Sequence, residues 1–264
     1  MFVTRLVSGI VLVGLALLTI CTGNWVLFAT VLALSLIGAN ELYKVMKVRP
    51  EEGGFSLLEL AGYLGICLYY ASLVLAKGEY TLGALMAAMI LIMCVYVFSY
   101  PKYHAHQIMA AFFGIVYVAV MLSCVYRTRM LEGGAWHVWL IFLCSWGCDT
   151  CAYCVGKLIG KHKMAPVLSP KKSIEGAVGG VVGAILLGLL YALATQGPAT
   201  AYMIICGAGA LISMVGDLAA SAIKRNMGIK DYGKLIPGHG GILDRFDSVI
   251  FTAPVIFYLS SILI

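Results

Sequence analysis

Acidic and basic side chains surround one glycine-rich segment near the C-terminal end of the chain. Residues 237–241 read Pro-Gly-His-Gly-Gly, which cannot continue a helix because Pro lacks a backbone donor and Gly favours irregular backbone. Backbone N–H groups in such a loop can approach an anion closely. Asp217 precedes the loop, and Asp244, Arg245 and Asp247 follow it. Carboxylates beside phosphate-binding groups suit Mg²⁺, so we interpret the segment as a magnesium–polyphosphate site rather than a plain connecting loop.

A second set of polar residues lies just upstream, on a segment expected to be helical. Asp217, Ser221, Lys224 and Arg225 would share one face of a helix. The stripe can be a metal-binding carboxylate beside phosphate-binding cations. It can equally be a charge pair that reaches the membrane interface along its aliphatic stems. The bracketed glycine-rich loop favours the first interpretation.

Two further features lie upstream of that stripe. Asp149 follows Trp146 inside an apolar run, where a charged group costs about 2.5–3.5 kcal/mol. It should therefore face a protein cavity or a metal, unless it lies near a helix end and is solvated. The basic segment 157–172, which contains Ser169, Lys171 and Lys172, would attract phosphates, although membrane-protein loops are often basic.

Three cysteines, Cys148, Cys151 and Cys154, follow a CxxCxxC pattern. Because this spacing places them on one side of a helix within an apolar run, we interpret them as packing residues rather than metal ligands.

The composition defines the elements that must position these residues. Of 264 residues, 62% are hydrophobic and 11% are charged, whereas soluble domains carry roughly 25% charged residues. A membrane-spanning helix needs about 20 apolar residues. Nine runs meet this need: 6–22, 25–43, 57–76, 81–99, 106–126, 135–155, 176–195, 199–220 and 247–264. We predict an all-α polytopic membrane protein of about nine helices. It forms a single domain, 1–264, with N-terminal helices in 1–134 and the catalytic helices and loops in 135–264.

The placement of Lys and Arg orients these helices. With nine spans, all but three of the 18 Lys and Arg residues fall on the side of the N-terminus, the exceptions being Lys77, Arg127 and Arg129. Positive residues accumulate in cytoplasmic loops. The sequence therefore predicts a cytoplasmic N-terminus, an outside C-terminus and a site that faces the cytoplasm.

The C-terminal half resembles the phosphatidate cytidylyltransferase, or CDP-diacylglycerol synthase, family. The family's signature is similar to S-x-x-K-R-x4-K-D-x-G-x2-[IL]-P-G-H-G-G-x-x-D-R-x-D, and the chain matches it throughout. The matching residues are Ser221, Lys224, Arg225, Lys230, Asp231, Gly233, Ile236, Pro237, Gly238, His239, Gly240, Gly241, Asp244, Arg245 and Asp247. An upstream pattern also fits, at Asp149, Thr150, Ala152, Tyr153, Gly156, Gly160, Lys161, Ser169, Pro170, Lys171, Lys172, Ser173, Glu175 and Gly176. Residues 1–140 match only as generic spans.

The resemblance implies the reaction of CTP with phosphatidate to give CDP-diacylglycerol and diphosphate at a cell membrane. It also implies Mg²⁺ held by Asp217 and Asp244, with K⁺ as a candidate second ion, and a homodimer; we expect no nucleic-acid partner. We assign catalytic roles to Asp217, Asp244, Lys224, Arg225, Lys171, Lys172, Arg245 and His239. Substrate-binding roles fall to Asp149, Ser169, Ser221, Lys230, Asp231, Gly238, Gly240, Gly241 and Asp247. Asp149 and Asp231 are the second candidates for the metal.

Two alternatives remain. A CTP-dependent lipid kinase would need a base to deprotonate an alcohol, and the unbroken signature argues against it. A transporter or scaffold would spread acids along several spans, whereas Glu41 is the main acid in the first five runs.

Overall fold

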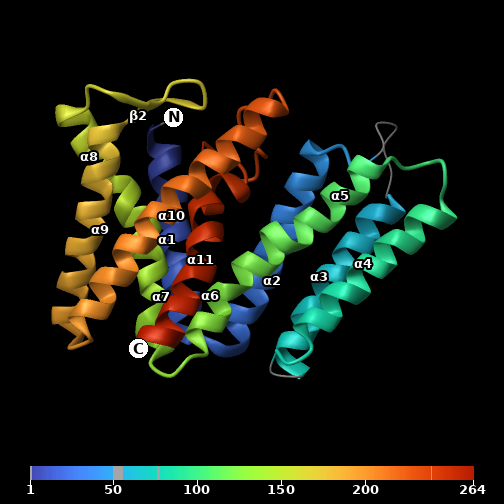
Figure 1. Cartoon of the computed structure of the whole chain (residues 1–264), viewed down its shortest axis with the longest axis horizontal. Coiled ribbons are helices and arrows are strands. Elements are labelled where there is room, and N and C mark those ends of the chain that lie inside the picture. The colour runs from blue at the N-terminus through green and yellow to red at the C-terminus, as the bar shows by residue number, and fades with distance from the viewer. Residues whose placement is uncertain (1, 50–55, 76–77, 239) are drawn as a thin grey trace.

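The computed structural model describes residues 2–49, 56–75, 78–238 and 240–264, with side chains described from residue 9 onward. The helices of the protein are tilted and form one bundle (Figure 1). The helices of the N-terminal part are α1 (Phe2–Thr22), α2 (Asn24–Val45), α3 (Leu57–Leu75), α4 (Thr81–Phe98), α5 (Ala105–Gly114), the π-helical η1 (Ile115–Val120) and α6 (Met121–Arg129). Those of the C-terminal part are α7 (Gly134–Phe142), the π-helical η2 (Leu143–Gly147), α8 (Cys148–Ile159), α9 (Ile174–Thr195), α10 (Ala199–Asn226) and α11 (Leu243–Leu263).

The prediction of a helical membrane protein is confirmed. Two of the spans are composite, since α5, η1 and α6 run on as Ala105–Arg129 and α7, η2 and α8 as Gly134–Ile159. Within the described residues, eight helices are long and apolar enough to cross a bilayer, and α1 supplies the ninth expected helix. The beginning of α1 and the end of α11 lie at opposite ends of the bundle (Figure 1), as an odd number of passes requires.

Two helices extend further than their apolar runs. Helix α10 continues to Asn226, past the predicted end at residue 220, and α11 begins at Leu243, before the predicted start at residue 247. Ala, Lys and Arg are good helix formers, so the backbone of α10 stays helical where the chain has become polar. As a result, Lys224 and Arg225 lie on α10, as the shared-face interpretation required, and Asp244 lies on a helix rather than in a loop.

A short antiparallel hairpin adds strand structure that the all-helical prediction did not include. Strand β1 (Lys163–Ala165) pairs with β2 (Ser169–Ser173). Glu175 anchors the hairpin, because its carboxylate accepts from the backbone N–H of Lys161 at 3.0 Å and lies 2.6 Å from His162 Nδ1. Ser173 caps α9 by accepting from Gly176 N–H at 3.1 Å.

Glycine-mediated contacts hold α8, α9 and α10 together. A Cβ at Gly180 of α9 would lie 3.0 Å from Cys148 Sγ of α8, and one at Gly188 would lie 2.8 Å from Cys206 Sγ of α10. Small residues let helix backbones approach closely, which is how membrane helices pack without a hydrophobic driving force. The opposite face of α9 carries exposed aliphatic side chains, at Val178, Val182, Leu186, Leu190 and Leu193.

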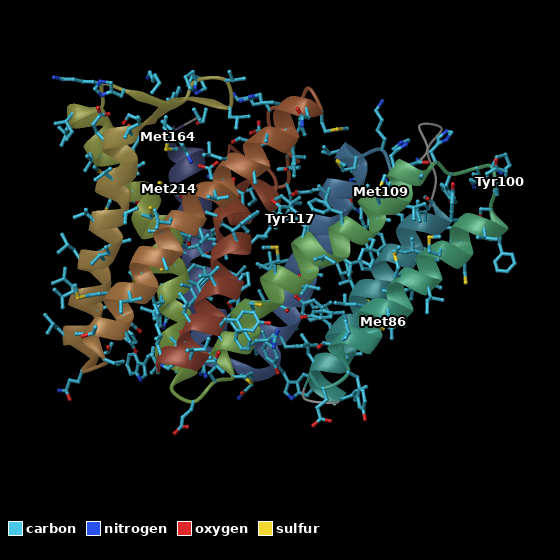
Figure 2. All side chains as sticks on the ribbon, viewed as in Figure 1. Met86, Tyr100, Met109, Tyr117, Met164 and Met214 are labelled. Carbon is cyan, nitrogen blue, oxygen red and sulfur yellow. The ribbon has the colours of Figure 1, made fainter. Side chains whose placement is uncertain are left out.

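The N-terminal helices pack through large aromatic side chains, and glycines make room for some of them, as Gly62 and Gly114 do for the Tyr43 ring. Tyr43, Tyr69 and Tyr70 are almost fully buried. Tyr117, labelled in Figure 2, lies between the two parts of the bundle, with its ring centroid 6.0 Å from that of Phe251 on α11. Met86 and Met109, by contrast, are exposed on the outer surface of the bundle (Figure 2).

Candidate functional site

A polar cleft opens where α10 and α11 meet α1 and α8. This acid cleft has a volume of about 380 Å³. Its lining consists of Gly9, Leu12, Val13, Trp146, Asp149, Asp217, Lys224, Asp244, Arg245, Phe246, Asp247 and Ser248. One wall is therefore apolar and comes from α1, whereas the opposite walls carry acids and cations from three other helices.

Four acids of the described chain line this cleft, and three of them come from three different helices. Asp149 lies in the first turn of α8, Asp217 in α10 and Asp247 near the start of α11. Asp217 forms an ion pair with Lys172 of β2, both side chains being about a quarter exposed. Carboxylates that share one cleft repel one another, so their ionised forms need more positive charge than a single lysine supplies.

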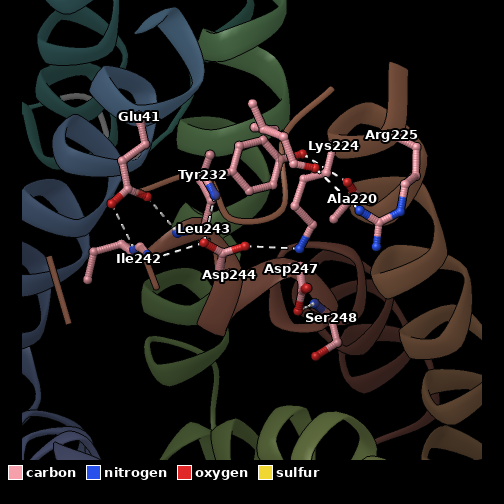
Figure 3. Close-up of polar contacts among 12 residues, drawn as sticks. Glu41, Ala220, Lys224, Arg225, Tyr232, Ile242, Leu243, Asp244, Asp247 and Ser248 are labelled. Carbon is pink, nitrogen blue, oxygen red and sulfur yellow. Dashed lines mark hydrogen bonds and ion pairs between the residues drawn. The ribbon is translucent and has the colours of Figure 1, made fainter. Parts of the chain in front are cut away.

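Asp244 has a different environment, because protein donors engage both of its oxygens. Its side chain is 2% exposed; Oδ1 accepts from Lys224 Nζ at 2.9 Å, and Oδ2 accepts from the N–H groups of Tyr232 at 2.8 Å and Gly241 at 2.9 Å (Figure 3). A carboxylate offers about four acceptor positions, so one position on Oδ1 remains. The sequence allowed a charge pair within the α10 stripe itself. In the structure the partners come from elsewhere, because Lys224 pairs with Asp244 of α11 and Asp217 pairs with Lys172 of β2.

The loop between α10 and α11 forms a tight turn. Ile236 N–H donates to Gly240 O at 2.8 Å, and Gly238 and Gly240 have φ values of 77° and 87°. Side chains other than Gly rarely adopt this left-handed region, which explains the glycines of the motif. His239, assigned a catalytic role from the sequence, lies outside the described residues.

This turn borders a second cleft, of about 650 Å³, which we call the loop cleft. It is lined by Lys230, Asp231, Gly233, Lys234, Ile236, Pro237, Gly238, Gly240 and Arg245. Arg245 lines both clefts. A guanidinium at that position can contact anions on either side.

Most of the predicted residues converge on the two clefts, and a few lie beside them. Asp149, Asp217, Lys224, Asp244 and Asp247 line the acid cleft. Lys230 and Asp231 line the loop cleft. Asp231 therefore lies in a different cleft from the other predicted acids. In the described part of the chain, neither lining includes Ser169, Lys171, Lys172, Gly241, Ser221 or Arg225, although Lys172 reaches Asp217 at the edge of the acid cleft.

Those flanking residues have their own positions. Ser169 and Lys171 lie on β2, the strand that carries Lys172. Ser221 lies on α10 between Asp217 and Lys224. Arg225 directs an N–H to Ile229 O at 3.4 Å, within the loop that follows α10.

Tyr232 is a site residue that the sequence did not single out. Its hydroxyl donates to Ala220 O at 3.2 Å, and Lys224 Nζ lies 5.4 Å from its ring centroid. Burial raises the pKa of Tyr232, so the hydroxyl stays protonated as a donor. Glu41 was noted only as an unusual acid, yet it contacts the same loop. Neither Tyr232 nor Glu41 belongs to a regularly spaced set of polar residues, so the sequence pattern did not indicate that they are part of the site.

The three cysteines divide into packed and exposed positions. A Cβ at Gly180 would lie 3.0 Å from Cys148 Sγ, and one at Gly183 would lie 2.6 Å from Cys151 Sγ, so these two pack against α9. Cys154 is exposed and does not share that packing.

The donor set of the acid cleft fits a hard divalent cation. Among the described residues, no three His, Cys, Asp or Glu side chains form a ready-made metal cage. Mg²⁺ rarely uses an all-protein cage; it binds through one or two carboxylates together with water and substrate phosphate oxygens. The carboxylates that line the acid cleft, beside a lysine and an arginine, fit this mode of binding.

The architecture and the clefts define a class: a multi-pass helical membrane protein with a polar, phosphate-compatible site at one end of its bundle. Comparison of the sequence with known families makes the assignment specific. The cytidylyltransferase family matches residues 3–263, and the chain belongs to this family.

Curated relatives match over nearly the full length. The chain is 31% identical to a phosphatidate cytidylyltransferase of Synechocystis over 98% of this chain and 97% of the relative. It is 30% identical to a phosphatidate cytidylyltransferase of Staphylococcus epidermidis, with 96% of each chain covered. A phosphatidate cytidylyltransferase of Staphylococcus aureus is 36% identical over 66% of this chain and 67% of its own length.

Proposed function

We propose that the chain is a phosphatidate cytidylyltransferase that converts CTP and phosphatidate into CDP-diacylglycerol and diphosphate. The observation that carries the proposal is the position of Arg245, which lines the acid cleft and the loop cleft at once. Two phosphate-bearing substrates must meet in this reaction, and each cleft offers a place for one of them. The names of the full-length relatives support the same substrates.

The loop cleft is the better place for the nucleotide. It is the larger of the two, at about 650 Å³, and its lining includes Lys230, Lys234 and the turn residues Pro237, Gly238 and Gly240. N–H groups in a glycine-rich turn and nearby lysines bind polyphosphates. In this arrangement the leaving diphosphate lies along the turn.

The acid cleft suits the lipid. Leu12 and Val13 of α1 form its apolar wall, so acyl chains can remain in the bilayer beside α1 while the phosphate enters among Lys172, Lys224 and Arg245. The lysines are already placed beside carboxylates. The phosphate head group can thus enter the site while the acyl chains stay in the lipid.

The reaction requires alignment and charge neutralisation. An oxygen of the phosphatidate phosphate attacks the α-phosphorus of CTP, a new P–O bond forms, and the bond from the α-phosphorus to the oxygen of the departing diphosphate breaks. The nucleophile is already an anion, so no side chain needs to deprotonate it. Arg245, Lys172 and Lys224 offset the charge of the two approaching phosphates, as in phosphoryl-transfer sites generally.

We assign the metal to Asp217 and Asp244, with Asp149, which lines the same cleft, as the next candidate. When bound, Mg²⁺ would neutralise phosphate oxygens of the substrates. Asp217 is the more open of the two ligands, and Asp244 also orders the loop through its hydrogen bonds. A second, monovalent ion such as K⁺ and a homodimeric assembly remain predictions from the family resemblance.

The site is proposed to face the cytoplasm, because the Lys and Arg residues gather on the side of the chain that carries it. Both this orientation and the activity are tested with sealed membrane vesicles of the two orientations and labelled CTP, which does not cross a bilayer. We expect labelled CDP-diacylglycerol from added phosphatidate and Mg²⁺ only in inside-out vesicles. Right-side-out vesicles should become active once detergent opens them.

Replacing phosphatidate with a prenol tests the alternative that the chain is a CTP-dependent lipid kinase. Transfer of label from γ-labelled CTP to the prenol, without formation of CDP-diacylglycerol, would overturn the proposed function. Activity in sealed right-side-out vesicles would overturn the orientation alone.

A further inference from the structure

Glu41 is a buried acid in the N-terminal part of the bundle that contacts the catalytic loop directly. It lies near the end of α2 and is 7% exposed. Its Oε1 accepts from Ile242 N–H at 3.0 Å and its Oε2 accepts from Leu243 N–H at 2.9 Å (Figure 3). These contacts join residues that are about two hundred positions apart in the sequence.

The two N–H groups belong to the beginning of α11. Ile242 is the residue before the helix and Leu243 is its first residue. The first N–H groups of a helix have no partner within the helix, and a carboxylate there satisfies them and interacts favourably with the helix dipole. Ile242 itself has an aliphatic side chain that cannot cap, so Glu41 supplies the cap from a different helix.

The loop has room for this carboxylate because two of its residues are glycines. A Cβ at Gly233 would lie 2.5 Å from Glu41 Oε1, and a Cβ at Gly241 would lie 2.5 Å from both Oε1 and Oε2. Any larger residue at either position would displace the acid or the loop. The glycines therefore serve the approach of Glu41 as well as the shape of the turn.

Two carboxylates thus hold the same short segment from opposite sides. Asp244 binds the N–H groups of Tyr232 and Gly241 from within α11, and Glu41 binds the next two N–H groups from α2. Of these two contacts, the second connects the loop to the N-terminal helices. The residues that follow, Arg245 above all, lie within one turn of the point that Glu41 fixes.

We propose that Glu41 is a positioning residue of the cytidylyl-transfer site, one that sets the start of α11 and thereby places Asp244, Arg245 and Asp247 toward the two clefts. This inference rests on the proposed function. It assigns a specific positioning role to the N-terminal part of the bundle, which lies outside the C-terminal signature although the family model covers it.

The test compares Glu41→Ala, Glu41→Asp and Glu41→Gln with wild type in detergent micelles. A shift of about 1 Å in reacting groups can cost on the order of 100-fold in rate, so we expect Glu41→Ala to lower kcat about 10- to 100-fold. The KM for CTP should change less than threefold. Glu41→Gln keeps one acceptor oxygen and should recover a large part of the lost kcat, whereas the shorter Asp should not.

Amide hydrogen exchange gives a readout that does not depend on turnover. In Glu41→Ala the N–H groups of Ile242 and Leu243 should exchange faster, while those in the middle of α11 keep their protection. Glu59→Gln is the matched control, because Glu59 is another buried acid of the N-terminal helices but pairs with Arg49 at 2.9 Å. It should leave both kcat and exchange at Ile242 and Leu243 unchanged.

A double-mutant cycle with Gly233→Ala completes the experiment. Because the added methyl group collides with the carboxylate, its effect on kcat should shrink when Glu41 is already Ala. If folded Glu41→Ala keeps wild-type kcat, or if both exchange rates are unaltered, the inference is wrong. If wild type itself forms no CDP-diacylglycerol, the proposed function fails instead, and the exchange data still decide whether Glu41 orders the loop.

Discussion

The N-terminal and C-terminal parts of the bundle are held together by different side-chain chemistry. In the N-terminal part, buried tyrosines donate or accept specific hydrogen bonds, such as Tyr43 Oη to Ala111 O and Tyr70 Oη to Ser35 Oγ, each at 2.8 Å. Glycines of the N-terminal part, such as Gly62 and Gly114, make room for a tyrosine ring, whereas those of the C-terminal part, at Gly180, Gly188 and Gly209, lie against small or aliphatic side chains of neighbouring helices. The polar clefts lie in the second region.

The difference indicates how the chain keeps a charged site next to lipid. Close backbone packing leaves few degrees of freedom for α8, α9 and α10, so the acids they carry have fixed positions. Tyrosine packing is bulkier and gains its specificity from individual hydroxyl groups. We therefore expect substitutions in the C-terminal part to affect catalysis or packing strongly. Apart from Glu41, which contacts the start of α11, polar residues of the N-terminal part should cost single hydrogen bonds when they are replaced.

The largest effects should come from the acids of the C-terminal site. Asp217→Asn and Asp244→Asn should each lower the rate about a thousandfold, as loss of key electrostatic groups does elsewhere. Asp217→Asn should leave the stability near that of wild type, because its side chain is 26% exposed. Asp244→Asn should also lower the free energy of unfolding by on the order of 3 kcal/mol, since it leaves the largely buried Lys224 without its carboxylate partner. CDP-diacylglycerol formation against Mg²⁺ concentration, with thermal unfolding, measures both quantities.

Glu79→Gln provides the matched control, as an exposed acid in the N-terminal part that also becomes an amide. It should be neutral. Near-normal activity and Mg²⁺ dependence in Asp217→Asn would contradict the assignment of that carboxylate to the metal, and Asp149 would replace it.

An intermediate effect is expected from Gly209→Ala on α10. The new Cβ would lie 2.6 Å from Cys144 Sγ and 2.9 Å from Ile256 Cδ1, and overpacking of this kind costs about 1–3 kcal/mol. Gly14→Ala on α1 is the control, because nothing lies within 4 Å of its added Cβ. Thermal unfolding in detergent compares them; equal stabilities would show that the glycine contacts do not set the packing.

The smallest effect should come from Tyr70→Phe in the N-terminal part. The change removes the hydroxyl that bonds Ser35 and keeps the ring, so it should cost about 1 kcal/mol and leave kcat unchanged. Ser35→Ala completes a double-mutant cycle, measured by unfolding in detergent. A substantial loss of kcat would mean that the tyrosine packing also positions the site.

The spans were predictable from the sequence because each needs a long apolar run, and such runs are visible without knowledge of their neighbours. The site was predictable where charged residues are unusual for their surroundings, as at Asp149 and Asp217. The polar end of α10 was predictable from the shared helix face of residues 217–225, whereas the start of α11 at Leu243 was not, since hydropathy is low there while the backbone is already helical. The pairing of Lys172 with Asp217 and of Lys224 with Asp244 depends on how β2 and the α10–α11 loop fold back, which no spacing reveals.

The hydrogen bonds that hold the α10–α11 loop affect which substitutions the loop can accept during evolution. Asp244 and Glu41 grip the loop by four backbone N–H groups, and every residue type except proline carries that group. The shape of the loop is therefore insulated from most substitutions in the side chains it carries. Leu235, exposed on this loop, can be exchanged freely, and new nucleotide contacts can be tried at Lys230 or Lys234 without rebuilding the turn beneath them.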